Sequence, residues 1–353
     1  MTFLINILIF LLMLSIIVAI HEFGHFLFAK LTGVYVYEYA IGMGPKLFSF
    51  KPKKSETTYS LRAIPLGGFC SLAGEDTGSD DEENIPEERR LQGKKAWQRF
   101  LIMFFGPGFN FLLAMLTLFI IAMIWGSTTY TPIVNEVTKD TPAYQAGIEK
   151  NDKIVQIDNH KIKTIDDVSL YLTLSDKTKK TVIKVQKKNT NKIETYKVKP
   201  KKITKDKQKT YVYGIGLKAE KTTGFVNACK YVVVKTGSLF RQMFATLGAL
   251  FTGKVSVNDL SGPVGIYSIV SKQAQSGISN LLYLMAYLSI NVGFINLLPI
   301  PAFDGGHILF ILIELIRRKP LKPEVENMIH TVGLCLLLLL MIYVTINDIF
   351  RLF

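Results

Sequence analysis

Four runs of apolar residues divide the sequence, and each is long enough to predict a membrane-spanning helix. About 20 apolar residues cross ~30 Å of hydrocarbon as a helix, and the runs lie within residues 1–30, 100–126, 277–317 and 318–353. The third run is too long for one straight helix and is interrupted by proline, glycine and asparagine. Irregular backbone at membrane depth is tolerated only against protein or a cavity, so we expect a broken helix there.

The segments between these runs have other patterns. Residues 31–74 alternate β-branched or aromatic residues with polar ones, which predicts short membrane-associated strands and hairpins. Such a sheet edge could pair with an extended substrate or be purely structural, and the pattern leaves both open. Residues 75–99 are typical of a charged cytoplasmic loop. Residues 127–221 predict a small α/β domain, and residues 222–276 predict an amphipathic interfacial helix followed by a Gly-Pro-Val-Gly turn.

Basic residues flank the apolar runs at one end of each, and this asymmetry predicts the orientation of the spans. By the positive-inside rule, the basic ends face the cytoplasm. Both termini and the domain of residues 127–221 are therefore expected outside. The basic residues concerned are Lys30, Lys94, Lys95, Arg99, Arg317, Arg318 and Lys319.

Composition supports a polytopic α-helical membrane protein with one polar domain. Hydrophobic residues make up 49% of the 353 residues, which is too many for an ordinary soluble enzyme. The net charge of +14 is concentrated between residues 130 and 221. Those lysines lack interleaved aromatic residues and a nucleic-acid-binding motif, so a basic surface near anionic lipid is the favoured interpretation.

Neither the cysteines nor the N-terminus suggests a secreted protein. Cys70, Cys229 and Cys335 are far apart and odd in number, which predicts no disulfide framework and no cysteine-based zinc site. No basic residue precedes the first apolar run and no small-residue cleavage pattern follows it, so we expect that run to remain as a helix.

Polar residues inside the first apolar run indicate chemistry. His21 and His25 are four residues apart and therefore lie on the same face of a helix, with Glu22 beside them. This is the HExxH arrangement, in which two imidazoles bind zinc and the glutamate is a general base. Ionisable residues are costly inside a membrane unless they face a cavity or a partner, which favours a site over an ordinary wet helix face.

A third zinc ligand is expected in the broken segment. A hydrolytic zinc site usually has three protein ligands and one open position, and Asp304 is the only acid between Asp259 and Glu314. The alternative for Asp304 is capping of the helix that begins at Gly305. His307 could compete as a ligand, although we favour packing or support of the ligands for it.

Asn110 also lies within an apolar run. It could donate a hydrogen bond to another helix or simply pack in the interior.

Several motifs together resemble one protease family over nearly the whole chain. They are HEFGH in the first run, GPVGI at residues 262–266, NLLPIPAFDGGH in the third run, and the segment TPAYQAGIEKNDKIVQIDNHKI. That last segment resembles a PDZ domain of bacterial proteases, with Ala146, Gly147, Asp152 and Asn159 at its turns; Asn151 and His160 stand where glycine is usual, and His160 is expected in a turn. The whole is similar to the site-2 protease family of intramembrane zinc metalloproteases, of the type that regulates bacterial sigma factors, here with one PDZ domain. Phe303 departs from the leucine that the family usually has.

The resemblance implies a mechanism and a setting. His21, His25 and Asp304 would bind Zn²⁺, Glu22 would take a proton from the attacking water, and Asn296 and Pro299 would help to hold substrate. The expected substrates are transmembrane segments of single-pass proteins, such as anti-sigma factors or signal-peptide remnants, already cut once outside. The expected location is the bacterial cytoplasmic membrane, with the active site toward the cytoplasmic side.

Two other classes of protein fit parts of the sequence. An intramembrane set of histidine and aspartate could form an ion pathway in a zinc transporter. A membrane scaffold that carries a PDZ domain without catalysis is the second alternative, although the intact set of His21, Glu22, His25 and Asp304 argues against it.

Overall fold

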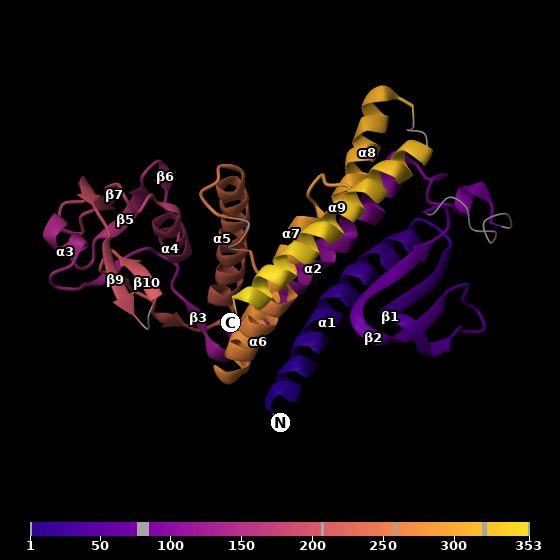
Figure 1. The fold of residues 1–353 in the computed structure, drawn as a ribbon, viewed down its shortest axis with the longest axis horizontal. Coiled ribbons are helices and arrows are strands. Elements are labelled where there is room, and N and C mark those ends of the chain that lie inside the picture. Colours follow the sequence, from indigo (N-terminus) through magenta and orange to yellow (C-terminus); the bar gives the residue numbers. More distant parts are fainter. Residues whose placement is uncertain are drawn as a thin grey trace. The chain divides into compact units, whose positions relative to one another are not determined.

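The computed structural model describes residues 2–75, 85–205, 208–256, 258, 260–319 and 323–351. Contacts divide the chain into two units, one formed by Met1–Leu118 with Asn258–Phe353 and the other by Phe119–Val257 (Figure 1). Residues 76–84 of the expected charged loop and residues 320–322 of the expected cytoplasmic turn lie outside the described residues.

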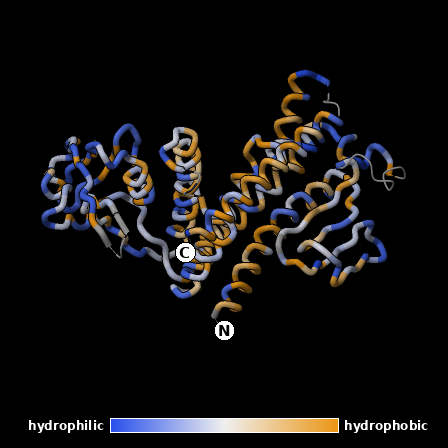
Figure 2. The backbone as a smooth tube through the Cα atoms, viewed as in Figure 1, coloured by the Kyte–Doolittle hydropathy of each residue, from blue (hydrophilic) through white to orange (hydrophobic). Residues whose placement is uncertain are grey.

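Four of the described helices are long and apolar enough to cross a membrane. Their apolar side chains are largely uncovered by protein, since only 22% of the most apolar window of the first helix and 6% of that of the last are buried. Figure 2 shows hydrophobic residues along the length of these helices. Helices that hide so little apolar surface within the protein need an apolar surrounding. They are α1 (Thr2–Leu31), α2 (Ala96–Trp125), α7 (Ile278–Asn296) and α9 (Pro323–Phe350).

The third apolar run is broken, as the sequence predicts. Helix α7 ends at Asn296, and α8 (Asp304–Arg317) begins after a loop. Two glycines let α8 start directly against this loop, because a Cβ on Gly305 would lie 2.1 Å from the Leu298 carbonyl oxygen and one on Gly306 would lie 2.7 Å from that of Ile300. The two glycines are therefore a steric requirement of the loop.

Helix α9 holds the same loop from the other side. The imidazole Nδ1 of His330 accepts a hydrogen bond of 3.0 Å from the backbone N–H of Ala302. One turn further along α9, a Cβ on Gly333 would lie 2.5 Å from Cβ of Pro301. The loop that precedes Asp304 is thus fastened to the last helix.

Residues 36–72 form one curled sheet rather than several short hairpins. The sheet contains only two strands, β1 (Val36–Phe50) and β2 (Thr58–Leu72), each of 15 residues. The first part of β1 pairs with both ends of β2, so that Ile41 is opposite Gly68 in one register and Leu61 in the other. Positive φ angles of 88° at Gly42 and 92° at Gly67 allow the strands to fold back.

The segment after the predicted interfacial helix is also helical. We expected only a turn at Gly-Pro-Val-Gly, but Pro263 begins a helix, α6 (Pro263–Gln275). The N-terminus of α6 is satisfied from α9, where the buried Asp348 accepts a hydrogen bond of 2.8 Å from the backbone N–H of Gly265.

The unit Phe119–Val257 contains a small β domain and one long helix. The central sheet has the strand order β6-β5-β7-β8, and α4 (Ile165–Leu174) begins with a capping box of Thr164 and Asp167. His160 lies in strand β6 rather than in the expected turn, and its ring stacks on Tyr171. The other elements are β3 (Ser127–Thr128), β4 (Val134–Val137), α3 (Pro142–Ala146), β5 (Lys153–Ile157), β6 (His160–Lys161), β7 (Thr181–Gln186), β8 (Ile193–Val198), β9 (Lys201–Lys205), β10 (Gln208–Val212), β11 (Ile215–Leu217) and β12 (Lys221–Thr222).

The long helix α5 (Phe225–Phe251) is fastened to α4 of that domain by charged side chains. Nε of Arg241 lies 3.1 Å from the carboxylate of Asp167, which is fully buried. Nζ of Lys235 lies 2.7 Å from the carboxylate of Asp166. Because a buried carboxylate is costly without a partner, these contacts make α5 part of the domain.

Candidate metal centre

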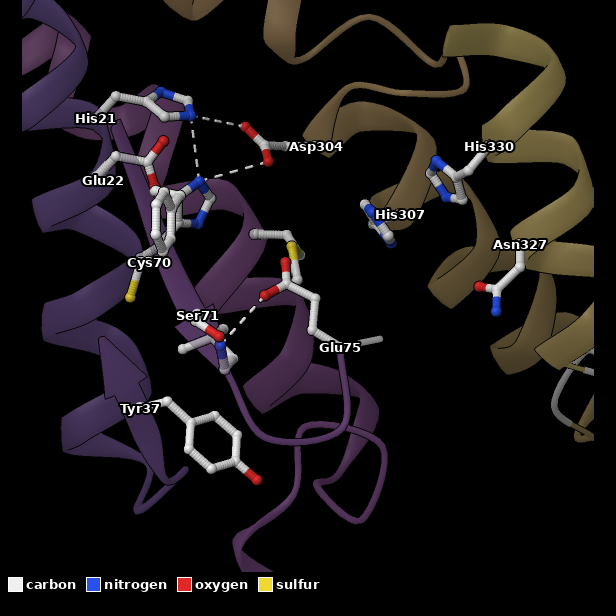
Figure 3. Close-up of a pocket in the computed structure, with 14 residues that line it drawn as sticks. His21, Glu22, Tyr37, Cys70, Ser71, Glu75, Asp304, His307, Asn327 and His330 are labelled. Atoms are coloured by element: carbon white, nitrogen blue, oxygen red, sulfur yellow. Dashed lines mark hydrogen bonds and ion pairs between the residues drawn. The ribbon is translucent and has the colours of Figure 1, made fainter. Parts of the chain in front are cut away.

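His21 and His25 present the same ring nitrogen to one point. Both are buried on α1, with their Nε2 atoms 3.2 Å apart. The carboxylate of Asp304 reaches the same point, with Oδ2 3.2 Å from Nε2 of His21 and Oδ1 3.4 Å from Nε2 of His25 (Figure 3). The structure therefore brings together the three side chains that the sequence predicts as metal ligands.

The spacing of these three donors fits a zinc ion. Zinc binds nitrogen or oxygen at about 2.0–2.2 Å, and tetrahedral donors at that radius are ~3.3 Å apart. Two imidazoles and one carboxylate are a common donor set for hydrolytic zinc, and they leave one position open. The donors are neither thiolates nor an all-oxygen cage, so the set differs from those typical of Cu(I) and of Mg²⁺ or Ca²⁺.

Asp304 does not have the capping role that was the alternative for it. It is the first residue of α8, and Phe303 occupies the capping position without a side-chain hydrogen bond. Oδ2 of Asp304 is buried and makes no hydrogen bond of good geometry, although it lies near His21. A buried carboxylate oxygen in that position is suited to a cation.

Helix α2 supplies the surface against which the histidines are placed. Nδ1 of His25 lies 2.9 Å from the backbone carbonyl oxygen of Ile102. Gly106 leaves room for the His25 ring, and Gly24 on α1 lets the helices approach so closely that a Cβ there would lie 2.0 Å from the carbonyl oxygen of Phe105. Gly24 and Gly106 thus determine how closely the two helices approach each other at His25.

Glu22 lies beside the histidines on α1 in the same cavity, which has a volume of about 730 Å³ (Figure 3). Gly68 of β2 lies against it, since a Cβ on Gly68 would be in ordinary contact with Cγ of Glu22, at 3.5 Å. Phe69, Cys70 and Ser71 of the same strand line the cavity. The candidate base and the end of β2 therefore share one wall of the site.

The other ionisable side chains of β1 and β2 near Glu22 are held neutral. Burial, followed by the nearby Glu22 carboxylate, raises the pKa of Tyr39 to about 12. Burial also raises the pKa of the Cys70 thiol, again with Glu22 as the second cause. A protonated thiol is a poor metal ligand.

His307 does not join His21 and His25. Its Nδ1 lies 3.6 Å from the Glu326 carboxylate, and its ring stacks on His330 with 4.0 Å between centroids. These three residues form a second group whose ligand-type atoms lie within 4.8 Å of one another. However, His330 accepts the Ala302 N–H at Nδ1, so its neutral ring carries the proton on Nε2 and offers no lone pair there. We interpret the group as support for the loop, not as a metal site.

The two residues predicted to hold substrate lie outside the cavity wall. Asn296 is the last residue of α7, and Pro299 is exposed in the loop. Neither is among the described residues that line the cavity. Their role in substrate binding stays a prediction.

Asn110 contacts the site, which decides between the two roles that the sequence left open for it. Its amide lies 3.2 Å from Nδ1 of His21. The spacing of Gly106 and Asn110, one helical turn apart in an apolar run, was a signal for this contact. By contrast, the Ile102 carbonyl is backbone and has no sequence signal.

Comparisons with known proteins agree with this chemistry. The sequence model described as peptidase family M50 matches residues 9–340. A provisionally named zinc metalloprotease of Clostridium acetobutylicum is 36% identical over 344 residues, which cover 98% of this chain and 97% of that protein. One of Clostridium perfringens is 38% identical over 340 residues, covering 96% and 97%. The regulator of sigma-W protease RasP of Bacillus subtilis is 32% identical over 419 residues, covering 98% of each chain.

Proposed function

The chain belongs to peptidase family M50 and is a zinc metallopeptidase, and from this premise we propose that it cuts peptide bonds within transmembrane segments of other membrane proteins. The observation that carries the proposal is the meeting of His21, His25 and Asp304 from two helices, with Glu22 beside them. Among the described residues, α1, which carries both histidines and Glu22, is one of four helices long and apolar enough to span a membrane.

Each residue of the site has a definite role in this proposal. His21, His25 and Asp304 hold zinc, which when bound acidifies a water molecule and polarises the scissile carbonyl. The Glu22 carboxylate accepts the proton of the attacking water and then donates it to the leaving amine. The low exposure of both histidines keeps bulk water from competing with these contacts.

The end of β2 is the proposed docking edge for an unwound substrate. A helical peptide bond is covered because its carbonyl is already hydrogen-bonded within the helix, so cleavage requires an extended segment. Residues 68–72 pair with β1, and four of them line the cavity beside Glu22. A substrate segment that adds to β2 as a further strand would form backbone hydrogen bonds with it. The unwound segment would then lie next to Glu22.

We further propose the membrane arrangement that the sequence favours. The chain lies in the bacterial cytoplasmic membrane, with both termini outside and the site toward the cytoplasmic side, because basic residues such as Lys94 and Arg317 mark the inner ends of the spans.

Residues 127–221 form a PDZ domain outside, which admits substrates that another protease has already shortened. Its support is the strand and helix pattern and the positive φ of 92° at Gly147 after α3. Helix α5 lies at the outer membrane surface, with Val226, Val233 and Phe244 exposed along it.

The substrates are proposed to be single-pass membrane proteins such as anti-sigma factors. The support is the name of the Bacillus relative, a regulator of sigma-W protease. Signal-peptide remnants have the same physical form, namely one apolar helix without a large outer domain.

Reconstitution with a membrane-embedded test substrate measures this function directly. The full chain and the Glu22→Gln, His21→Ala and Glu75→Gln variants would be placed in vesicles with a single-span peptide, and products would be identified by mass spectrometry. We expect cleavage inside the span by the native chain and by Glu75→Gln, whose carboxylate bonds the backbone N–H of Leu72 at 3.4 Å. Glu22→Gln should keep zinc but lose cleavage by at least about 1,000-fold.

Other outcomes would favour the alternative classes. Zinc flux across the vesicle membrane without any cleavage by the native chain indicates a transporter. Unchanged cleavage by the His21→Ala variant shows that the proposed site does not perform the reaction.

A further inference from the structure

One face of α2 supports both histidines from behind. Ile102, Gly106 and Asn110 are spaced by four residues and therefore lie one above another along the helix. The first touches His25 through its carbonyl, the second makes room for the His25 ring, and the third touches His21 through its amide. Helix α2 thus contacts Nδ1 of each histidine.

The hydrogen bond from His25 to Ile102 leaves the lone pair of Nε2 free to bind a metal. A carbonyl oxygen can only accept, so Nδ1 of His25 carries the proton and donates it to Ile102. In a neutral ring the lone pair then lies on Nε2, which faces Asp304. His25 is in the form that binds a metal through Nε2.

The contact of His21 is different because an amide has two ends. The amide nitrogen of Asn110 is placed 3.2 Å from Nδ1 of His21, while the amide oxygen is buried without a hydrogen-bond partner. If the amide nitrogen donates to Nδ1, a neutral His21 carries its proton on Nε2 and has no lone pair for a metal. A half-turn of the amide exchanges the two ends with almost no change of shape.

We propose that Asn110 is the positioning residue for His21 and that, in the zinc-bound enzyme, its amide oxygen accepts the Nδ1–H of that imidazole. The inference rests on the proposed ligand set, because only a metal at Nε2 requires this tautomer. The number of hydrogen bonds between the two side chains is the same in both orientations. Metal binding therefore selects the orientation, and the amide in turn favours metal binding.

The surroundings leave Asn110 little freedom to be replaced. Its side chain is fully buried, so bulk water does not supply an alternative acceptor for Nδ1. Its backbone oxygen also accepts a hydrogen bond of 2.8 Å from the buried Ser289 hydroxyl, which fixes α2 against α7 at that level. Loss of such a support for a metal-bound histidine typically weakens metal binding 10- to 100-fold.

Zinc affinity of the full-length protein tests the proposal without relying on catalysis. The dissociation constant would be measured by chelator competition at fixed pH in detergent or nanodiscs, for the native chain and for Asn110→Leu, Asn110→Asp, Thr117→Val and His21→Ala. Thr117 is a matched control, since it is a buried polar residue of α2 that bonds the carbonyl of Leu113. Unfolding in excess chelator reports the fold without metal.

The variants separate positioning from packing. We expect Asn110→Leu, which keeps the volume but not the acceptor, to weaken zinc binding 10- to 100-fold. Asn110→Asp keeps an acceptor and should remain within about threefold of the native value or bind more tightly, as should Thr117→Val. If Asn110→Leu binds zinc as well as the native chain, or Asn110→Asp binds it as weakly as Asn110→Leu, the proposal is wrong.

The same measurements remain decisive if Asn110→Leu does not fold. In that case Asn110→Asp alone decides, because weakening of more than about tenfold contradicts an acceptor role. Failure of the proposed ligand set can be distinguished from failure of the positioning role. If the ligand set is wrong, the native chain binds no zinc, or the His21→Ala variant binds zinc as well as the native chain does. If those two controls behave as expected, an unaffected Asn110→Leu overturns only the positioning role.

Discussion

Gly106 lies so close to His25 that a Cβ on this glycine would be 2.1 Å from Nε2 of the imidazole. Nε2 is the atom that faces Asp304, so the glycine directly limits where one of the candidate metal ligands lies. The contact also joins α1 and α2 at the level of the site.

Gly106→Ala should remove zinc and activity together. The added methyl group must displace the imidazole or the helix, and a ligand shift of about 1 Å costs on the order of 100-fold in activity. The matched control is Gly108→Ala on the same helix, where the nearest side-chain atom would be at an ordinary 3.4 Å. Cleavage rate and bound zinc per chain measure the effect, and equal losses in the two variants would contradict the steric explanation.

Gly333→Ala should loosen Asp304 without touching it. A methyl group there would overlap Pro301 in the loop before the aspartate, whereas a Cβ on Gly248 in α5 would meet no atom within 4 Å. We expect Gly333→Ala to lower the thermal midpoint and to weaken zinc binding at least about tenfold, by analogy with other supports of metal ligands. Gly248→Ala should stabilise its helix slightly, by about 0.5–1 kcal/mol. A loss of stability with unchanged zinc affinity would show that the loop does not position the ligand.

Acid should weaken the contact between α1 and the β1–β2 connection through Glu56. Partial burial opposes ionisation of this residue, but hydrogen bonds from Lys30 and Arg89, both at 2.7 Å, outweigh it and hold its pKa below the ordinary value of 4.5. A carboxylate with a lowered pKa contributes stability above its unfolded pKa and loses it as pH falls through the folded one. The native chain should therefore exceed Glu56→Gln in stability by about 1 kcal/mol at pH 7.

That difference should shrink as the pH falls below the ordinary pKa of 4.5 and disappear once the pH lies below the lowered pKa of the folded carboxylate, where Glu56 is protonated in both states. Thermal unfolding in detergent between pH 7 and pH 3 measures it, with the exposed Glu88→Gln as control. A difference between the native chain and Glu56→Gln that persists unchanged at pH 3 would mean that charge is not its cause.

Arg241→Met should detach α5 from the small β domain. The substitution keeps an apolar stem but leaves the fully buried Asp167 without its guanidinium partner. Removing one member of a buried ion pair costs about 3–5 kcal/mol, and backbone N–H groups at Lys163 and Thr164 reduce this cost. Hydrogen exchange of α4 and α5 should accelerate in Arg241→Met and stay unchanged in Lys230→Met, an exposed cation on the same helix. Equal exchange in both variants would show that the ion pair is dispensable.

The candidate site was predictable from sequence where its signal is local or unique. His21 and His25 have the spacing of one helix face, and Asp304 is the only acid in a long apolar segment. All three residues could therefore be identified without a structure. The supports of these ligands could not, because they depend on atoms that carry no residue type, such as the Ile102 carbonyl, or on distant pairings such as His330 with Ala302.

The fold shows the same limit. Helix α5 lies within residues 222–276, where the sequence predicts an amphipathic helix, because amphipathic spacing is a local signal. Helix α6 was missed because Gly-Pro-Val-Gly was interpreted as a turn, although proline also suits the first position of a helix, and its N-terminus is satisfied by Asp348, far along the chain. The length of β1 and β2 was underestimated because their glycines mark bends within strands rather than ends.

The separation of the ligands along the chain has a consequence for biosynthesis. His21, Glu22 and His25 leave the ribosome long before Asp304, and the loop that holds Asp304 also needs His330 and Gly333 of the last helix. A nascent chain stalled in the translocon thus carries two imidazoles and a base but no completed chelate. On the proposed ligand set, peptide hydrolysis therefore has to wait until the final helix has been synthesised.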